Sequence, residues 1–286
     1  MHVRGFRLTD TAVLSPPHRR LFPSRLRQSN GRVWIVANEQ GTAVGYALTT
    51  PVPGLPGLLE LDGHILPQQQ RKGYGRFLLQ HVLQDLAKTN AWQLSHSVTD
   101  VNTPAAHFLR ACGFFVEHEE WTMVNEQLAM SNEQTALDNC SLFIVHSDWA
   151  TAVPTFLSLY HKAFSPHPWY QPFTPTEVQA TLAHPTDLLF LQSPIPNLQS
   201  PSPIGFAWLR QDGTASEIEP IGIVPAWQGK GYGRILLTAA LQQLAQRGAT
   251  AVQITTWRSN TAAIHLYQSL GFQHNHTITY LAYNLP

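Results

Sequence analysis

QGKGYGRILL, residues 228–237, occurs a second time upstream in nearly the same form, as QRKGYGRFLL at residues 70–79. An offset of 231 − 73 = 158 residues aligns the two stretches, and the same offset runs without a gap from 67–114 to 225–272. Within that span 20 of 48 positions are identical, more than two unrelated units with similar apolar spacing would share. The sequence therefore predicts an internal duplication, with one domain for each copy.

The composition agrees with two folded domains and narrows the range of partners. The chain has 286 residues, of which 43% are hydrophobic, and this length suits two domains of about 140 residues each. Lys plus Arg and Asp plus Glu both number 18, and no run of like charge occurs, so we expect no nucleic-acid partner and no membrane partner. No apolar stretch approaches the roughly 18 residues of a membrane span, and MHVRGFRLTD at the start lacks the apolar core of a signal peptide, which predicts a cytoplasmic protein.

Cysteine and histidine usage argues against disulfides and metals. The chain contains two cysteines, Cys112 and Cys140, without a CxxC spacing, so neither a disulfide framework nor a zinc site is expected. The 14 histidines are scattered without a ligand-like register. We therefore expect a reducing compartment and no bound metal.

Patterning divides the chain into a first domain at 1–125, a polar linker at 126–140 and a second domain at 141–286. Each copy has the order strand, helical region, three strands, helix, strand, helix, strand, which is an α/β arrangement with hairpins first and crossovers later. In the second copy the expected elements are 141–147, 149–164 with 175–183, 187–192, 203–210, 215–224, 231–247, 250–257, 261–270 and 272–284. A proline-rich loop is expected at 193–203.

The glycine stretch joins a strand to a helix. It follows the apolar run IGIVP at 221–225 and opens a segment with apolar residues at helical spacing. Gly229, Gly231 and Gly233 allow a tight turn that gathers free backbone amides at the positive end of a helix, an arrangement that binds phosphate. A P-loop would need Gly-Lys-Ser/Thr, but the lysine here is followed by glycine. A dinucleotide fingerprint would need a third glycine where Leu236 stands.

The remaining pattern is Gln-x-x-Gly-x-Gly, present in both copies, and it is followed at 258–272 by RSNTAAIHLYQSLGF, with an asparagine, an interior tyrosine and a closing Leu-Gly-Phe. In this order and spacing the two motifs resemble the pyrophosphate loop and the second motif of the GCN5-related N-acetyltransferases (GNAT family). The resemblance implies two tandem GNAT-like domains, each a mixed, mostly antiparallel sheet flanked by helices. It also implies acetyl-CoA as the acetyl donor.

The resemblance further implies which residues hold acetyl-CoA. Asn260 could contact the cofactor or a water, or it could only cap the helix that follows it. Without the resemblance, the loop itself could be a plain glycine turn. The implied residues are Ile223, Val224, Gln228, Gly229, Lys230, Gly231, Tyr232, Gly233, Arg234 and Asn260 in the second copy, and Gln70, Lys72, Gly73 and Gly75 in the first.

Tyr267 matches the tyrosine of the second motif, which in the family often protonates the leaving thiolate. The same offset gives Leu109 in the first copy, and leucine cannot donate a proton. The resemblance therefore implies a catalytic second domain and a degenerate first one. The alternative is an ordinary core tyrosine, because Tyr267 lies on an apolar helical stripe.

The strand before the loop supplies candidate bases. Glu217 and Glu219 alternate onto one face of this strand, and the constant offset aligns them with Leu59 and Leu61 of the first copy. Family members often carry the base here, and the spacing of Glu217 to the loop fits the family pattern better. The alternative is that either glutamate is solvated at a bulge, since Pro220 interrupts sheet pairing.

The expected activity is acetyl transfer by direct attack of a primary amine, on a small molecule or a peptide, in the second domain. Trp169, Tyr170 and Phe173 lie in the loop where family members contact the acceptor, so they could line the acceptor site or simply pack on the sheet. The rival function is a non-catalytic module that binds or senses acetyl-CoA. The sequence fixes neither the acceptor nor the oligomeric state.

Overall fold

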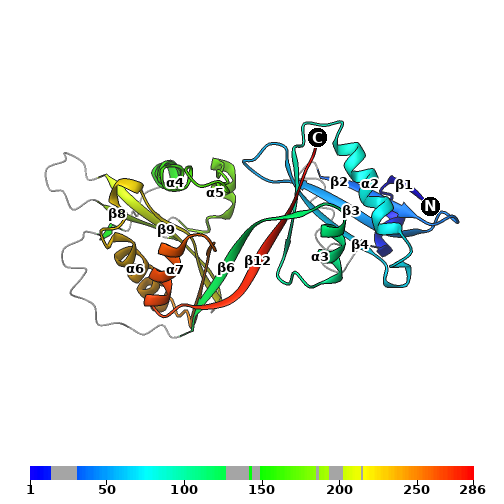
Figure 1. Ribbon diagram of the computed structural model, residues 1–286. Helices are drawn as coiled ribbons and strands as arrows, with labels where there is room; N and C mark the ends of the chain where they lie inside the picture. Colours follow the sequence, from blue (N-terminus) through cyan, green and yellow to red (C-terminus); the bar gives the residue numbers. More distant parts are fainter. Residues whose placement is uncertain (14–30, 127–141, 144–148, 185–186, 193–201, 214) are drawn as a thin grey trace. The chain divides into compact units, whose positions relative to one another are not determined.

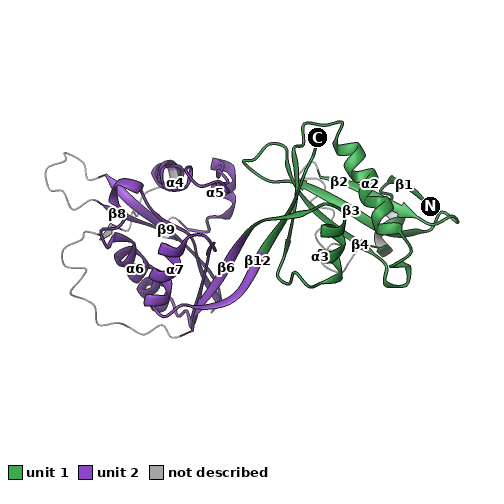
Figure 2. Ribbon diagram, viewed as in Figure 1, with its two compact units in different colours: residues 1–118, 279–286 green, residues 119–278 purple. Residues whose placement is uncertain are grey.

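The chain forms two compact units (Figures 1 and 2). Its computed structural model describes residues 1–13, 31–126, 142–143, 149–184, 187–192, 202–213 and 215–286. Unit 1 comprises residues 1–118 and 279–286, and unit 2 comprises residues 119–278. Nearly all of the predicted linker, most of the strand predicted at 141–147, Cys140 and most of the proline-rich loop lie outside the described residues.

Unit 1 is an α/β unit with one mixed sheet. The strands follow the order β1-β2-β3-β4-β5-β12, and every neighbouring pair is antiparallel except β4 and β5, which are parallel. Helices α2 and α3 cover one face of this sheet and share a hydrophobic core with it. The elements are β1 (His2–Gly5), η1 (Leu8–Val13), β2 (Arg32–Ala37), β3 (Ala43–Pro51), β4 (Leu58–Ile65), η2 (Pro67–Gln69), α2 (Tyr74–Leu86), β5 (Gln93–Val98), α3 (Pro104–Ala111) and the start of β6 (Phe115–Asn125).

Unit 2 repeats this plan, and its sheet order is β7-β8-β9-β10-β11-β6, with β10 and β11 parallel. From α4 onwards, every described α-helix and strand of the second copy begins and ends within two residues of its expected bounds, which confirms those predictions. Of the strand predicted at 141–147, only residues 142–143 are described, as β7. The elements are β7 (Leu142–Phe143), α4 (Trp149–Phe164), α5 (Pro175–Thr181), β8 (Leu188–Gln192), β9 (Pro203–Asp212), β10 (Ala215–Ile223), η5 (Pro225–Trp227), α6 (Tyr232–Gln246), β11 (Ala251–Trp257), α7 (Thr261–Ser269) and β12 (Gln273–Asn284).

The sheet of unit 2 separates two hydrophobic cores. Leu236, Leu237, Ala240 and Leu244 of α6 pack with Ile264 of α7 in one core. The second core is largely aromatic and includes buried side chains of α4, α5, β8 and β9, among them Phe156, Val178, Phe190, Phe206 and Trp208. The helices of unit 2 therefore flank its sheet, as the family resemblance implies.

The two copies exchange their last strands. Residues 279–284 of β12 pair with β5 in unit 1, and residues 120–125 of β6 pair with β11 in unit 2. After the 158-residue offset both pairings have the same register, so the exchanged strands occupy equivalent positions. This arrangement differs from the predicted boundaries at 125 and 141. The physical reason is the duplication itself, because the repeated sheets offer each strand an equivalent edge.

The exchanged strands contribute to the cores that receive them. Met123 of β6 is fully buried in a core of unit 2, and Leu281 of β12 is fully buried in the core of unit 1. Burying a side chain of this size stabilises a fold by about 1.5–3 kcal/mol. Each unit therefore depends on a segment from the other copy for part of its packing.

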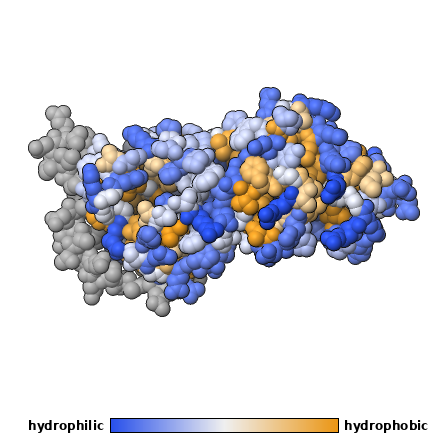
Figure 3. All heavy atoms as spheres, viewed as in Figure 1, coloured by the Kyte–Doolittle hydropathy of each residue, from blue (hydrophilic) through white to orange (hydrophobic). Residues whose placement is uncertain are grey.

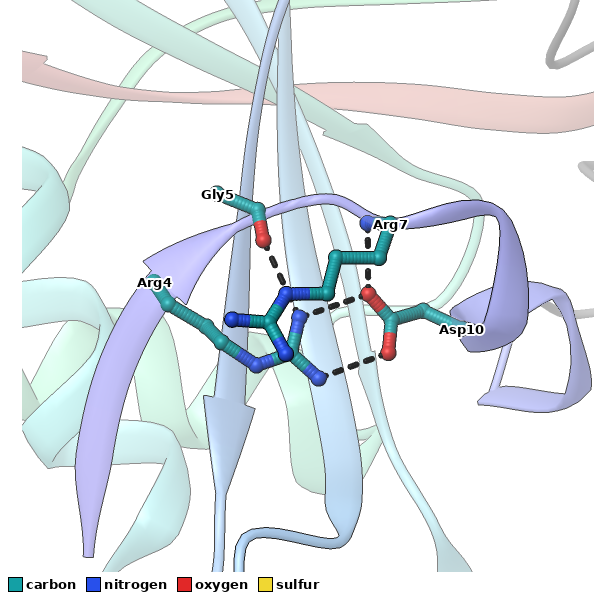
Figure 4. A network of polar contacts seen from close by, with 4 residues as sticks. All are labelled: Arg4, Gly5, Arg7 and Asp10. Atoms are coloured by element: carbon teal, nitrogen blue, oxygen red, sulfur yellow. Dashed lines mark hydrogen bonds and ion pairs between the residues drawn. The ribbon is translucent and has the colours of Figure 1, made fainter.

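An ion pair fixes the first strand of unit 1 to the short helix after it (Figure 4). The Arg4 guanidinium donates two hydrogen bonds of 2.7 Å to the Asp10 carboxylate, and the backbone N–H of Arg7 donates another at 2.7 Å. Asp10 is 3% exposed. The hydrogen bonds from Arg4 outweigh burial and hold the pKa of Asp10 below its usual range.

Candidate active site

Both units open a gap between two parallel strands. In unit 2, β10 and β11 pair only from Ala215–Ala251 to Glu217–Gln253, although both strands continue further. In unit 1, β4 and β5 pair only from Leu58–Gln93 to Glu60–Ser95. Each gap opens towards the end of the strand that leads into the glycine loop. The two units therefore place a strand gap and a glycine loop at the same point of the fold.

The glycine loops present free backbone amides. In the part of the chain that the structure describes, the N–H groups of residues 229–233 and 71–76 donate no backbone hydrogen bond. Gly231 and Gly73 precede the helices in the left-handed conformation, with φ of 87° and 85°. Consecutive free amides at a helix N-terminus form a cradle for an anionic group, so both loops fit the pyrophosphate of acetyl-CoA.

The glutamine that both loops share forms a hydrogen bond within the protein. Gln228 Nε2 donates to Ile223 O at 2.8 Å, and Gln70 Nε2 donates to Ile65 O at 3.0 Å. Each side chain thus ties the loop to the end of the preceding strand. The structure accounts for glutamine in both copies as a brace for the cradle.

The other predicted cofactor residues of unit 2 surround this cradle. Ile223 ends β10, and Val224 N donates to Ile204 O at 2.9 Å. Lys230 Nζ donates to Ala226 O at 3.0 Å, and Arg234 Nη2 donates to Ser269 Oγ at 2.6 Å. The Tyr232 ring lies 5.5 Å from that of Trp227. In unit 1, Lys72 Nζ donates to Gln69 Oε1 at 3.2 Å.

Two predicted residues have an evident structural role. Asn260 caps α7, because its side-chain oxygen accepts a hydrogen bond of 3.3 Å from Ala263 N. The absence of a side chain on Gly233 lets α6 approach α7, since an added Cβ would lie 3.3 Å from Leu266 Cδ2. Both features position the helices that border the strand gap.

The two glutamates of β10 interact. Burial, the negative charge of Glu217 and a hydrogen bond with Glu217 raise the pKa of Glu219 to about 8, against a smaller opposing effect of Arg210. Arg210 Nη1 lies 3.6 Å from Glu217 Oε2 in an ion pair. The arrangement keeps a proton on Glu219 near neutral pH.

Tyr267 faces this pair from α7. Its side chain is 5% exposed and packs in a core of unit 2, with its ring 5.9 Å from Phe272. Burial, and then the charge of Glu219, raise the pKa of the Tyr267 phenol above its usual value. The structure thus brings together the three predicted catalytic side chains, and the phenol is in its protonated state.

The predicted alignment of these glutamates with Leu59 and Leu61 is wrong. Ile218 pairs with Leu209 and Ile221 with Ala207, so β10 carries one extra residue at Glu219–Pro220. No such irregularity interrupts the pairing of β3 with β4. The bulge shifts the offset by one residue on the preceding part of the strand, where Glu217 corresponds to Glu60. Both units therefore have a glutamate at this level, and only β10 carries the bulge with Glu219.

The predicted acceptor residues divide between a surface loop and a core. Phe173 packs on the aromatic core, with its ring 4.8 Å from Tyr160 and 5.7 Å from Phe156. The Trp169 ring lies 6.1 Å from that of Trp257, and Tyr170 OH lies 3.1 Å from His161 Nδ1. Trp169, Tyr170 and Trp257 are partly exposed, and we call these three side chains the aromatic rim. The position of Phe173 is explained by its packing in the core.

Three residues near the glutamates escaped the sequence analysis. Burial is the main cause that raises the pKa of Tyr160 above its usual value, followed by the charge of Tyr170. The charges of Glu219 and Glu120 raise this pKa further. Trp257 ends β11 opposite Glu120. No sequence signal singled out these residues, and nothing in the sequence indicated that Glu120, from the last strand of the first copy, lies in unit 2.

Unit 1 has a pocket of its own, with a volume of about 440 Å³. The glycine loop lines it with Gln70, Gly73 and Gly75, and α3 contributes Leu109, which stands where unit 2 has Tyr267. His64 and His96 line the same pocket. Apolar side chains, orange in Figure 3, lie at the surface over the part of unit 1 that contains α2 and α3.

The described residues contain neither a candidate metal cluster nor a candidate membrane-spanning helix. In these parts of the chain no cluster of three or more His, Cys, Asp or Glu side chains could hold a metal ion. No described helix combines the length and apolar character needed to cross a membrane.

Comparison with known proteins identifies the family. The family model described as acetyltransferase (GNAT) family matches residues 6–114 and again residues 154–272. The mycothiol acetyltransferase of Kineococcus radiotolerans is 28% identical over 265 residues, covering 87% of this chain and 80% of that protein. The mycothiol acetyltransferase of Gordonia bronchialis is 30% identical over 241 residues, covering 81% of this chain and 75% of that protein.

A solved structure supports the fold. The GCN5-related N-acetyltransferase from Sphaerobacter thermophilus matches with a TM-score of 0.68 at 16% identity, covering 99% of this chain and 95% of that chain. The two family matches fall on the two copies that the glycine stretches predict. The chain therefore belongs to the acetyltransferase (GNAT) family, as an N-acetyltransferase that carries the family's domain twice.

Proposed function

We propose that unit 2 transfers an acetyl group from acetyl-CoA to a primary amine of a small molecule or a peptide. The observation that carries this proposal is the meeting of Glu219 and Tyr267 beside the gap between β10 and β11. The pKa of Glu219 is raised to about 8. The phenol of Tyr267 is buried, and the charge of Glu219 contributes to raising its pKa. A base and an acid of this kind are what direct attack on a thioester requires.

The loop of unit 2 would hold the donor. Free amides of residues 229–233 at the N-terminus of α6 suit a pyrophosphate, and Lys230 adds a positive charge beside them. Acetyl-CoA supplies the acetyl group as a thioester when it is bound. GNAT acetyltransferases generally use this donor, which supports the assignment.

Glu219 is the better candidate for the base. General bases work best with a pKa close to the operating pH, and the pKa of Glu219 is raised to about 8. Its carboxylate would accept the proton from the attacking amine nitrogen. Glu217, in contrast, is ion-paired with Arg210 and raises the pKa of Glu219 through its charge and its hydrogen bond. We therefore assign Glu217 to tuning the base.

Tyr267 would supply the proton that the leaving sulfur needs. Its raised pKa keeps the phenol protonated until a thiolate develops beside it. Its burial in a core of unit 2 fixes the ring, so the hydroxyl is positioned by packing. This role adds no demand on the fold, because a buried tyrosine also fills the core.

The acceptor would approach along the aromatic rim. Trp169, Tyr170 and Trp257 offer flat apolar surfaces, and Glu120 lies opposite Trp257 on the neighbouring strand. A carboxylate beside aromatic rings suits an amine that arrives as a cation. Relatives that span most of this chain are mycothiol acetyltransferases, which supports a small-molecule acceptor.

Unit 1 has a different part in this proposal. Its loop would bind acetyl-CoA through the amides around Lys72, Gly73 and Gly75, with Gln70 as the brace. Leu109 stands in place of the acid, so we expect no transfer to an amine in this unit.

The test is thiol release from acetyl-CoA across pools of primary amines, amino acids, peptides and amino sugars. We expect amine-dependent release that Tyr267→Phe lowers by about 10- to 1,000-fold in kcat with little change in acetyl-CoA affinity. Tyr283→Phe, a tyrosine of unit 1 that packs on Phe114, is the matched control. Unchanged turnover in Tyr267→Phe would remove this residue from the mechanism. Acetyl-CoA binding without release from any pool would favour the sensing module.

A further inference from the structure

The pocket of unit 1 contains two histidines that the proposed transfer does not use. His64 on β4 and His96 on β5 line it beside Gly73 and Gly75 of the glycine loop. At the equivalent levels unit 2 has Gly222 and Ile254. The imidazoles are therefore particular to the first copy, in the pocket where that copy lacks the tyrosine.

His96 stands where β4 and β5 separate. The last parallel pair is Glu60–Ser95, so the carbonyl of Leu61 lies beyond the part of β4 that pairs with β5. His96 Nδ1 lies 2.8 Å from Leu61 O. A carbonyl oxygen can only accept, so Nδ1 carries the hydrogen and the neutral ring has its free lone pair on Nε2. Across the described parts of the chain, Nε2 has no hydrogen-bond partner.

This position corresponds to the level of the base in unit 2. The strand pairings place Leu61 level with Ile218 and His96 level with Ile254. Glu219 is the residue that directly follows Ile218. His96 is thus within one residue of the level at which unit 2 carries its proposed base, but it extends from the other strand of the gap.

We propose that the pocket of unit 1 is a second acyl-thioester site, in which His96 is the general base for hydrolysis. The inference rests on the proposed function, because it assumes that the loop of unit 1 holds the same donor. Water is the nucleophile, since it needs no further binding residues.

The chemistry balances with these groups alone. His96 Nε2 takes a proton from water while the water oxygen bonds to the thioester carbonyl carbon. The C–S bond breaks with its electron pair on sulfur, and the protonated Nε2 returns the proton to the thiolate. The products are a carboxylic acid and a thiol. The proton that Nε2 takes from the water is the one that it returns to the sulfur, so this reaction needs no separate acid at the position of Leu109.

The kinetic test uses the full chain with unit 2 disabled by Glu219→Gln and Tyr267→Phe. Thiol release from acetyl-CoA is measured without any amine. We expect residual hydrolysis that an added His96→Gln lowers at least about tenfold. Glutamine keeps an N–H donor for Leu61 O but has no basic nitrogen. His81→Gln, at a histidine of α2 outside this pocket whose Nδ1 lies 2.9 Å from the backbone oxygen of Phe77, is the matched control and should change the rate by less than about twofold.

A second readout does not depend on activity. Equilibrium dialysis with CoA counts sites per chain, and carbethoxylation by diethyl pyrocarbonate, mapped by mass spectrometry, reports the accessibility of the His96 imidazole. Two CoA per chain and protection of His96 by CoA would support the proposal. Occupancy of unit 1 with a rate that His96→Gln leaves unchanged would overturn it, and so would an empty unit 1. Amine transfer that persists in the disabled background would instead contradict the proposed function.

Discussion

The glycine loops of the two units are nearly alike, whereas the groups around the two strand gaps differ. Gly73 and Gly231 have φ of 85° and 87°, and each glutamine brace reaches the end of its strand. Beside the gap, unit 2 has Glu219 and Tyr267, while unit 1 has His96 and Leu109. The anion cradle has been kept in both copies, and the groups that handle protons have changed.

Different physical constraints explain this contrast. The cradle depends on backbone conformation, and an L-residue in the left-handed region costs about 1–2 kcal/mol, so glycine is hard to replace there. A proton donor is a single side chain. Leu109 and Tyr267 are 6% and 5% exposed at equivalent positions of their helices, so either fills the core. The fold therefore tolerates loss of the hydroxyl more easily than loss of the loop.

The sharpest test of the difference between the units replaces the bulge glutamate. Glu219→Gln should lower kcat/KM for acetyl transfer by about 100-fold or more, because it removes the base. Glu60→Gln, at the level of Glu217 in unit 1, should change it by less than about twofold. Steady-state kinetics with one acceptor measures both. A large loss in Glu217→Gln with little effect of Glu219→Gln would assign the base to Glu217 instead.

The pH profile should carry the signature of unit 2. A base must be unprotonated, and the pKa of Glu219 is raised to about 8, so kcat/KM should rise with pH up to a midpoint near that value. The increase should be about tenfold per pH unit below the midpoint. Glu217→Gln removes the negative charge that raises the pKa of Glu219, so the midpoint of the profile should move to lower pH. Both profiles are measured with the same acceptor, so the titration of the acceptor amine does not contribute to the difference between them. A midpoint that does not move would contradict the coupling.

The two loops can be compared by one substitution in each. Gly231→Ala should raise the KM for acetyl-CoA about tenfold, because alanine is strained at the φ of 87° that glycine adopts here. We expect the loop to relax from this conformation, so that its amides lose their alignment. An added Cβ meets no atom within 4 Å at either glycine, so steric clash is not the cause. Gly73→Ala should leave transfer kinetics unchanged and weaken CoA binding to unit 1 in dialysis. Equal kinetic effects of the two variants would indicate that transfer needs both loops.

The smallest effect on activity is expected from the edge of unit 1. Asp10→Asn should destabilise the chain by about 2 kcal/mol in urea unfolding while kcat changes little. The pKa of Asp10 is lowered in the fold, so its contribution is present above pH about 4 and is lost as pH falls through the lowered pKa. The difference between the wild type and the variant should therefore shrink in acid. A parallel loss of kcat at neutral pH would show that the edge of unit 1 supports transfer.

Much of the fold could be predicted because its signals are local. Apolar periodicity and the glycine stretch placed the α-helices and strands of the second copy from α4 to β12 within two residues of their observed bounds. The sequence also singled out Tyr267, Glu217 and Glu219, because they lie within two short motifs, and their catalytic roles stay predictions. The error at Leu59 and Leu61 arose at Glu219–Pro220, where one extra residue in β10 is invisible to a constant offset.

The sequence by itself determined the duplication, the two loops and the absence of a tyrosine from the first copy. These features are recorded in residue identity and spacing. Only the tertiary structure decided that β6 and β12 exchange sheets, that Glu120 joins unit 2 and that His96 closes on Leu61 O. Strand partners and bulges are chosen among distant segments with similar local preferences, so the pairing energy of the assembled sheet selects them.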